Sequence, residues 1–253
     1  MKLVTISLLL LLIIVAIAWL IPSNAAQTPI QSSSDQKTDA TPIQVGVMSE
    51  KQRIHSRLLE SEGDRYKAVR RLDEFVDGQP RGAYIEPPLE ITSPDVPRLS
   101  FPDFIKALMC EADAVVTAVV TDRTSQLTEQ KKFVFTDYTM LVKEIYKGHL
   151  DIAPNTGITV MRPGGKVSIN GRIVTAIDSS YQLLESDKRY LLFLRYIPET
   201  GAYRSERKGT FLIDSESVIP QTEEFVPGLS TNSSGSLVSI RPALLSGCEP
   251  RRK

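Results

Sequence analysis

A series of short strand-like segments between residues 113 and 214 is the sequence feature that most limits how this chain folds. The segments are rich in β-branched and aromatic residues, and turn residues separate them. In order they are AVVTAVVTD, FVFTDYTMLVKEIYKG, GITVMRP, GRIVTAID, RYLLFLRYI, AYRSE and GTFLID. Many short strands with regular turn signals predict a small barrel or sandwich. We therefore expect a mainly β fold.

One of these segments, RYLLFLRYI, is apolar on both of its faces. Side chains of a strand alternate between its two faces, so one face carries Tyr190, Leu192 and Leu194 and the other carries Leu191, Phe193 and Arg195. Such a pattern is typical of a central barrel strand. We expect its aromatic residues, Tyr190, Phe193 and Tyr196, to pack in the core together with Tyr203. The alternative is that these rings line a ligand groove.

The glycine-rich stretch VMRPGGKVSING, residues 160–171, raises the question of a phosphate-binding loop. Such a loop needs Ser or Thr after its lysine and a helix behind it, but Val167 follows Lys166 and another strand pattern comes next. The stretch instead predicts two consecutive hairpin turns, at PGG and at the NG pair, with a short strand between them. Arg162 and Lys166 remain as candidate contacts at the rim of the barrel.

The N-terminus predicts export. A charge-free apolar run, residues 3–21, follows Lys2 and precedes Pro22 and several small residues. Residues 1–25 therefore indicate either a secretory signal that is cleaved after Ala25 or an uncleaved membrane anchor. In both cases the rest of the chain is periplasmic, secreted or held at the membrane. In an oxidising compartment Cys110 and Cys248 are expected to form a disulfide, with two free thiols as the alternative.

Three segments connect this terminus to the predicted barrel. Residues 26–50 are polar and predict a disordered tether. Residues 51–78 carry apolar residues at spacings of three and four and predict an amphipathic helix, which either binds a partner or packs on the domain that follows. Residues 79–102 form a proline-rich linker, which ends at a short helix over FPDFIKALMCEA with Pro102 in its first turn. The barrel domain is expected over residues 103–250.

Two stretches carry a family resemblance. CEADAVVTAVV (Cys110–Val120) and YTMLVKEIYKG (Tyr138–Gly148) resemble the opening strands of the netrin-like, OB-type β-barrel of tissue inhibitors of metalloproteinases. The motifs YKG, RPGG and RYLLFL are also similar to those of uncharacterised secreted bacterial proteins. The resemblance covers about half of the chain and implies an OB-like β-barrel in which Cys110 pairs with a late cysteine, here Cys248. Those inhibitors act through an amino-terminal cysteine that chelates zinc, and Cys110 lies too deep in the chain for that role.

Charge and composition argue against several functions. Lys plus Arg and Asp plus Glu are equal at 30 each, so no overall positive field attracts nucleic acid. The two histidines, His55 and His149, lie in different segments without neighbouring cysteines, so we expect no metal and no cofactor. No serine lies in a G-x-S-x-G motif. Asp137 lies within a strand pattern and is either a general base or a structural residue that pairs with Lys or Arg.

The sequence leaves three functions open. The first is a protein-binding or structural role of an exported or membrane-anchored domain in the cell envelope. The second is a secreted hydrolase that uses carboxylates at the barrel rim. The third is the binding of a small molecule or glycan on the barrel face, as OB folds do.

Overall fold

The computed structural model describes residues 48–61, 71–72, 84–85, 99–148, 152–229 and 234–248. All of these residues belong to one compact unit, Ala40–Lys253. The predicted signal or anchor, residues 1–25, lies outside the described residues, as does nearly all of the predicted tether. Within the described ranges, no helix has the length and the apolar character needed to cross a bilayer.

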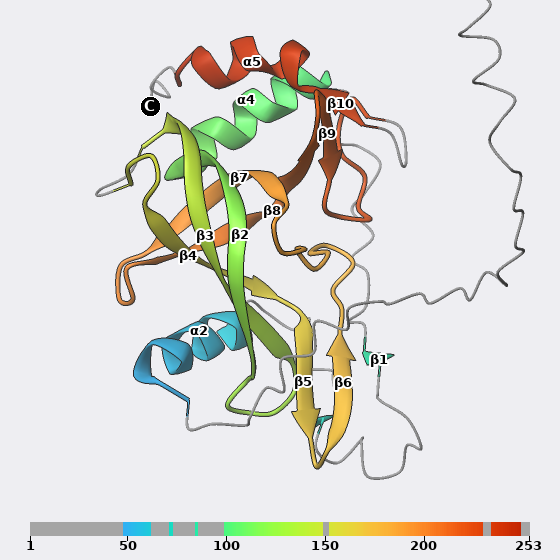
Figure 1. The fold of residues 1–253 in the computed structure, drawn as a ribbon. Helices are drawn as coiled ribbons and strands as arrows, with labels where there is room; N and C mark the ends of the chain where they lie inside the picture. The colour runs from blue at the N-terminus through green and yellow to red at the C-terminus, as the bar shows by residue number, and fades with distance from the viewer. Residues whose placement is uncertain are drawn as a thin grey trace, which may run out of the picture. The chain divides into compact units, whose positions relative to one another are not determined.

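Five strands form a sheet that closes on itself as a ring (Figure 1). They are β2 (Ala114–Leu127), β3 (Val134–Lys147), β4 (Gly157–Pro163), β7 (Arg189–Ile197) and β8 (Ala202–Asp214). Neighbours pair antiparallel in the order β4-β3-β2-β7-β8, and a short parallel pairing of β8 with β4 closes the ring. Beyond β8 the sheet continues through β9 (Ser217–Pro220) and β10 (Gly235–Ser236). The expected mainly β fold is confirmed.

Strand β8 unites two segments that the sequence analysis treats as separate strands, AYRSE and GTFLID. Its pairing with β7 is irregular between Leu192 and Leu194, and Lys208 on β8 has a left-handed backbone with φ of 64°. An irregularity of this kind bends a strand without ending it. The expected break is therefore a bend, and β8 continues past it to close the ring.

Both faces of β7 are buried, as the pattern of RYLLFLRYI predicts. One face carries Tyr190, Leu192 and Leu194 in a core with alternate residues of β2, β3 and β4. Leu191 and Phe193, on the other face, pack with the helix α4 (Phe101–Glu111) and the helix α5 (Leu237–Leu245). The prediction that these aromatic residues pack in the core is thus confirmed for Tyr190 and Phe193, both of which are buried.

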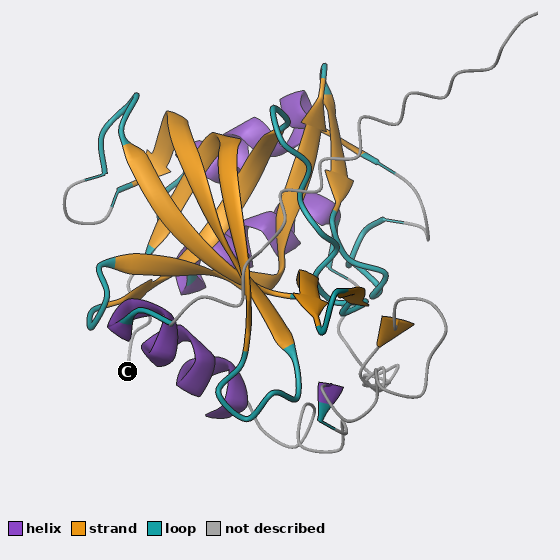
Figure 2. Ribbon diagram, turned by 60° about the horizontal axis from the view of Figure 1, so that its bottom comes forward, coloured by secondary structure: helices purple, strands orange, loops and turns teal. Residues whose placement is uncertain are grey.

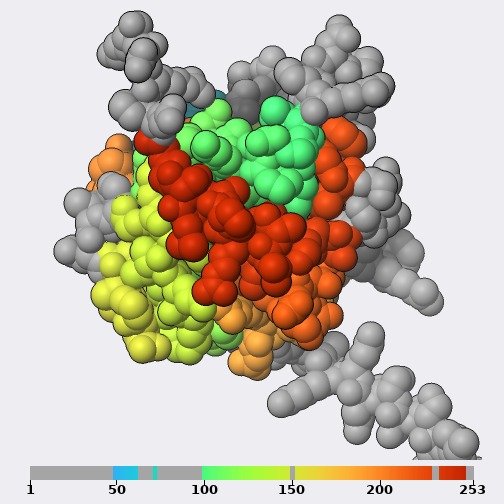
Figure 3. All heavy atoms as spheres, turned by 90° about the horizontal axis from the view of Figure 1, so that it is seen from above, coloured from blue at the N-terminus to red at the C-terminus, as the bar shows by residue number. Residues whose placement is uncertain are grey.

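Helix α4 begins as its sequence predicts. Ser100 caps the helix by accepting a hydrogen bond from the amide of Asp103 at 3.3 Å, and Pro102 lies in the first turn. The buried face contains Phe101, Ile105, Leu108 and Met109. Figure 1 shows α4 and α5 together at one end of the ring, and Figure 3 shows α5 packed beside α4 at the surface.

Helix α5 follows a polar, glycine-bearing stretch of the sequence and ends shortly before Cys248. Its Ile240 and Leu244 are four residues apart and fully buried against α4, so tertiary packing stabilises a helix that contains Pro242. The helix brings Cys248 to Cys110 at the end of α4, and the two form a disulfide with their Cα atoms 5.3 Å apart. The expected cysteine pairing is confirmed, and it links the two outer helices.

The NG pair forms the predicted hairpin turn. Asn170 and Gly171 have φ of 52° and 75° and connect β5 (Gly165–Ile169) to β6 (Arg172–Ala176). The prediction of a hairpin at PGG is wrong, because β4 and β5 belong to different sheets. At this crossing Gly165 has φ of 151° and lies so close to Ser125 and Thr136 that a Cβ atom would overlap their side chains.

The β5–β6 hairpin extends a second, smaller sheet to which an arm of the chain contributes. Strand β1 (Tyr84–Ile85) pairs in parallel with Thr175 and Ala176 of β6. One face of the hairpin packs against the helix α2 (Glu50–Ser61). The core between them includes Leu59 of α2 and Phe133. Helix α2 lies at the end of the ring away from α4 and α5 (Figure 1 and Figure 2). The predicted amphipathic helix is confirmed over the described residues 51–61.

Replacing Cys110 and Cys248 together by Ser is expected to lower the free energy of unfolding by about 2–4 kcal/mol, because the unfolded chain gains the entropy of an open loop. Denaturant unfolding of the oxidised protein and of the double variant measures the difference. Reduced wild-type protein provides the control and should behave like the double variant. Identical midpoints for the oxidised protein and the variant would contradict the prediction.

Candidate functional site

The side chain of His55 on α2 forms hydrogen bonds with two side chains of the ring. The imidazole is fully buried, with Nδ1 at 2.8 Å from Oδ1 of Asp137 on β3 and Nε2 at 3.0 Å from Oγ1 of Thr200. Thr200 lies in the turn between β7 and β8. The edge of the imidazole also contacts the Phe135 ring, with centroids 6.3 Å apart. One side chain of α2 thus joins two distant parts of the ring.

The hydrogen-bond partners determine how the imidazole of His55 is oriented. An ionised carboxylate only accepts, so Nδ1 carries a proton and donates to Asp137. In the neutral ring Nε2 then accepts from the hydroxyl of Thr200. Both ring nitrogens therefore have partners within the protein, which a buried imidazole requires.

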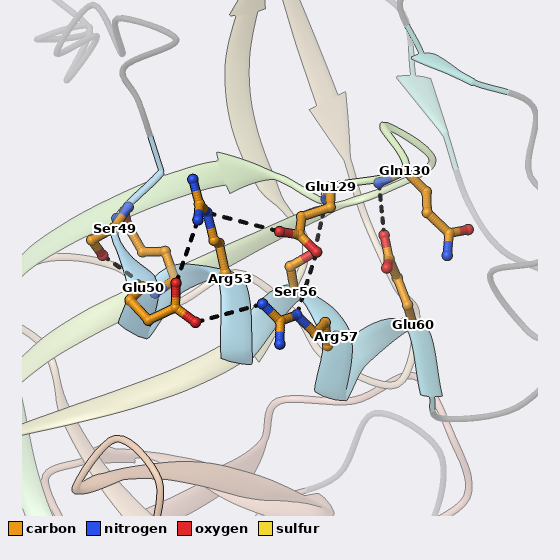
Figure 4. Close-up of polar contacts among 9 residues, drawn as sticks. Ser49, Glu50, Arg53, Ser56, Arg57, Glu60, Glu129 and Gln130 are labelled. Atoms are coloured by element: carbon orange, nitrogen blue, oxygen red, sulfur yellow. Dashed lines mark hydrogen bonds and ion pairs between the residues drawn. The ribbon is translucent and has the colours of Figure 1, made fainter.

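Further contacts hold α2 to the turn between β2 and β3 (Figure 4). Ser56 Oγ accepts from the amide of Glu129 at 2.8 Å, and Glu60 Oε1 accepts from the amide of Gln130 at 2.9 Å. These two contacts give partners to backbone donors of the turn. Leu59, 1% exposed, adds an apolar contact in the core that includes Phe133.

Ion pairs surround this polar interface at the surface. Arg57 lies 3.5 Å from Glu129 and 3.5 Å from Glu50, and Arg53 lies 3.4 Å from Glu50 and 3.9 Å from Glu129. Figure 4 shows the two arginines between the two glutamates. All four side chains are more than a third exposed, so solvent weakens each pair to a small contribution. The buried contacts of His55 and Ser56 therefore dominate the docking of α2.

A hydroxyl, an imidazole and a carboxylate in this order are also the groups of nucleophilic catalysis. In this structure the imidazole has no exposed surface, and the residues around it belong to the interface of α2 with the ring. The arrangement is built to hold a helix against a sheet. Asp137 pairs with a histidine rather than with the Lys or Arg that a cross-strand pair predicts.

His55 and Asp137 lie in separate segments, and no motif in the sequence predicts that they pair. Their sequence separation of 82 residues gives no periodic signal. A weak signal exists in each segment, because His55 shares the inward face of its helix with Leu59 and Asp137 interrupts a run of buried strand residues. Only the fold determines that these two polar residues become partners of each other.

Arg162 is not at a rim, and the expected surface contact there is wrong. Its side chain is 1% exposed because it follows Ile158 and Val160 on the core-facing side of β4. It donates to Ser205 Oγ at 3.0 Å, to Thr210 Oγ1 and to the Gln182 carbonyl at 3.0 Å. Burial lowers the pKa of the guanidinium, against the opposing effect of nearby tyrosines that include Tyr138.

Tyr181 and Tyr138 complete the surroundings of the Arg162 side chain. The guanidinium carbon lies 5.4 Å from the centroid of the Tyr181 ring, a cation–π distance. Burial raises the pKa of Tyr138, so its hydroxyl stays protonated beside the cation. The hydrogen bonds of the guanidinium therefore go to neutral oxygens, and its cation–π contact goes to an aromatic ring. Arg162 is a structural cation of the core.

Lys166 is exposed on β5, on the smaller sheet rather than on the ring. Its neighbours along the strand, Gly165 and Val167, are buried, because alternate residues of β5 face the core under α2. The predicted role of Lys166 in a contact stays a prediction. Lys166 lies on an edge strand of the smaller sheet and not at the expected rim of a barrel.

A second buried charge cluster surrounds Glu224, whose side chain is 4% exposed. Burial raises the pKa of this carboxyl, but hydrogen bonds and charges from Ser180, Arg207 and Lys208 act in the opposite direction and are together larger. The net effect holds the pKa below its ordinary value of 4.5. The ionised carboxylate therefore stabilises the loops that meet there.

No group of three or more His, Cys, Asp or Glu side chains is placed to hold a metal among the residues that the structure describes. His149 lies outside them. The models of known protein families give no match to this chain, and neither do the curated proteins.

Arg162→Ala is expected to lower the free energy of unfolding by at least about 3 kcal/mol, because buried oxygens of Ser205, Thr210 and Gln182 lose their donor and a cavity forms. Chemical denaturation measures the effect. Lys166→Ala, four positions along at an exposed site, is the matched control and should stay within about 0.5 kcal/mol of the wild type. Equal effects of the two substitutions would refute the structural role of Arg162.

Glu224→Gln is expected to destabilise the protein at neutral pH and to have less effect in acid. A carboxyl whose folded pKa lies below its unfolded value contributes stability above the unfolded pKa and loses it as pH falls through the folded pKa. The difference in unfolding free energy between wild type and variant should therefore shrink below about pH 4.5. Urea titrations from pH 7 to pH 3 measure it. A difference that is constant or grows in acid would show that Glu224 has no depressed pKa.

Proposed function

We propose that the ring-like sheet is an OB-like, netrin-like β-barrel. The order β7-β2-β3-β4 is that of a Greek key, in which the fourth strand returns beside the first. Strand β8 pairs with both β4 and β7, which gives the five-stranded Greek-key closure that is typical of OB folds. The disulfide from the segment before β2 to a late cysteine supports the netrin-like resemblance.

We further propose that this chain is an exported or membrane-anchored domain with a protein-binding or structural role in the cell envelope. The disulfide between Cys110 and Cys248 fits an oxidising compartment, and the apolar run 3–21 fits a signal or an anchor. The segment that leads from this run to the barrel includes α2, which docks on the barrel. An arm held in this way supports a role in positioning the barrel relative to its attachment.

The observation that carries the protein-binding role is the docking of α2. The ring surface holds a helix through Asp137, Thr200 and the amides of the β2–β3 turn. Matched polar groups around one buried apolar anchor are the anatomy of a protein interface. The site where polar side chains converge is thus occupied by protein, which favours a binding module over a pocket for a small substrate.

A secreted hydrolase is the second candidate, and the chain Thr200–His55–Asp137 is the observation that favours it. In that reading His55 takes the proton of the Thr200 hydroxyl as its oxygen attacks an ester or amide carbonyl, while Asp137 orients the imidazole. The bond to the alcohol or amine breaks, His55 gives the proton to that leaving group, and water then hydrolyses the acyl-enzyme. This reading differs from rim carboxylates acting alone, since the carboxylate acts through a histidine. The complete burial of His55 favours the binding module.

The proposed role is tested by photo-cross-linking of the full chain in intact envelopes. A photoreactive residue at Phe225 or at Ile173, which are 60% and 56% exposed, is expected to give a discrete product with one or a few envelope proteins. The same residue at the buried Phe193 is the matched control and should give none. His55→Ala is expected to leave the hydrolysis of chromogenic esters at the background rate.

Two results would contradict the proposal. Without a product at either exposed position, the protein-binding role fails. An esterase activity that His55→Ala abolishes, while Arg57→Ala on the same helix retains it, would establish the hydrolase instead.

A further inference from the structure

The outer edge of β5 carries backbone groups that no strand in the described part of the chain pairs with. In a hairpin with a two-residue turn the flanking residues, here Ile169 and Arg172, exchange hydrogen bonds, and every second pair along the strands does the same. The pairs of Lys166 with Thr175 and of Ser168 with Ile173 fall between them. The amide and carbonyl groups of Lys166 and Ser168 therefore point away from β6.

Within the described parts of the chain, β6 is the one strand that pairs with β5. The Lys166 side chain is exposed and that of Ser168 is half-buried, so the edge reaches the surface. An edge of this kind is a template for pairing with another extended segment. The outward groups of the two residues offer two donors and two acceptors.

The opposite edge of the same small sheet already binds an extended segment. Strand β1, from the proline-rich part of the chain, pairs in parallel with Thr175 and Ala176 of β6. The hairpin itself is fixed, because Val167 and Val174 on its inner face are buried in the core that α2 covers. A fixed edge does not have to be ordered on binding, which reduces the entropic cost.

Charge indicates the kind of segment that fits. Lysine on an edge strand opposes pairing between identical chains, because a second copy brings a second positive charge to the same small sheet. A segment with an acidic residue next to Lys166 instead forms a cross-strand ion pair while its backbone bonds to Lys166 and Ser168. Strand addition of this type takes its affinity from the main chain and its specificity from alternate side chains.

We propose that the outer edge of β5 binds an extended segment of a partner protein, which joins the sheet as a further strand with an acidic residue beside Lys166. This proposal rests on the protein-binding function proposed above and assigns its site. Lys166, expected from the sequence to make a contact, contributes both a backbone donor and a charge.

The test uses the full chain and a fluorescein-labelled hexapeptide, Thr-Val-Asp-Val-Thr-Val, in an anisotropy titration. Saturable binding is expected, together with slower hydrogen exchange at the amides of Lys166 and Ser168 but not at that of Val167. Lys166→Pro removes the outward donor and no β5–β6 hydrogen bond, so it should weaken binding at least about 10-fold. Lys166→Ala keeps the amide and should weaken binding only to the level of a peptide with Ala in place of Asp on the unchanged protein.

A hexapeptide with alternate N-methylated amides provides the same test without changing the protein, and it decides the matter if Lys166→Pro does not fold. The absence of saturable binding, or equal binding of the methylated peptide, would overturn the proposal. A dimer in sedimentation experiments that Lys166→Pro dissociates would overturn it in favour of a second copy.

Cross-linking in envelopes separates this proposal from the one on which it rests. If Lys166→Pro abolishes the product formed from position 173, both stand. If the product persists in Lys166→Pro, the edge is not the site although the protein binds a partner. If neither chain gives a product, the protein-binding function itself fails.

Discussion

The parallel pairing of β4 with β8 is the interaction on which the rest of the structure depends. It joins Val160 to Tyr203 and Met161 to Arg204, and it converts an open sheet into a ring. Closure creates an enclosed core lined by alternate residues of every strand. Because β2 and β7 are apolar on their outer faces as well, the closed ring still requires helices outside it, and α4 and α5 supply them.

The ring also determines where polar groups are buried. Arg162 reaches the core because it continues the inward face of β4, and the fold supplies oxygens of β8 and of the loop before β7 to receive its donors. His55 is buried from the other side, between β3 and the β7–β8 turn. Both terminal nitrogens of Arg162 have hydrogen-bond partners while its buried Nε has none among the described residues, and both ring nitrogens of His55 have a partner. Such partners reduce the cost of burying the two side chains. The first organises the core and the second fixes the arm.

Functionally, the two ends of the domain differ. At one end a disulfide links Cys110 on α4 to Cys248 just after α5. At the other, α2 and β1 of the N-terminal arm are held by hydrogen bonds and one small apolar core, next to the open edge of β5. The proposed binding role and its proposed site both lie at this second end, where protein segments already dock by the same physical means.

Sequence by itself determined what local rules decide: the mainly β fold, the NG turn, the capped start of α4 and the two apolar faces of β7. Each follows from backbone preferences or from residues a few positions apart. Tertiary structure alone decided that PGG crosses between sheets, that residues 237–245 form a helix, that Arg162 is buried and that His55 meets Asp137. These outcomes depend on which distant segments share a core, and a buried polar residue is tolerated only where such a segment supplies its partner.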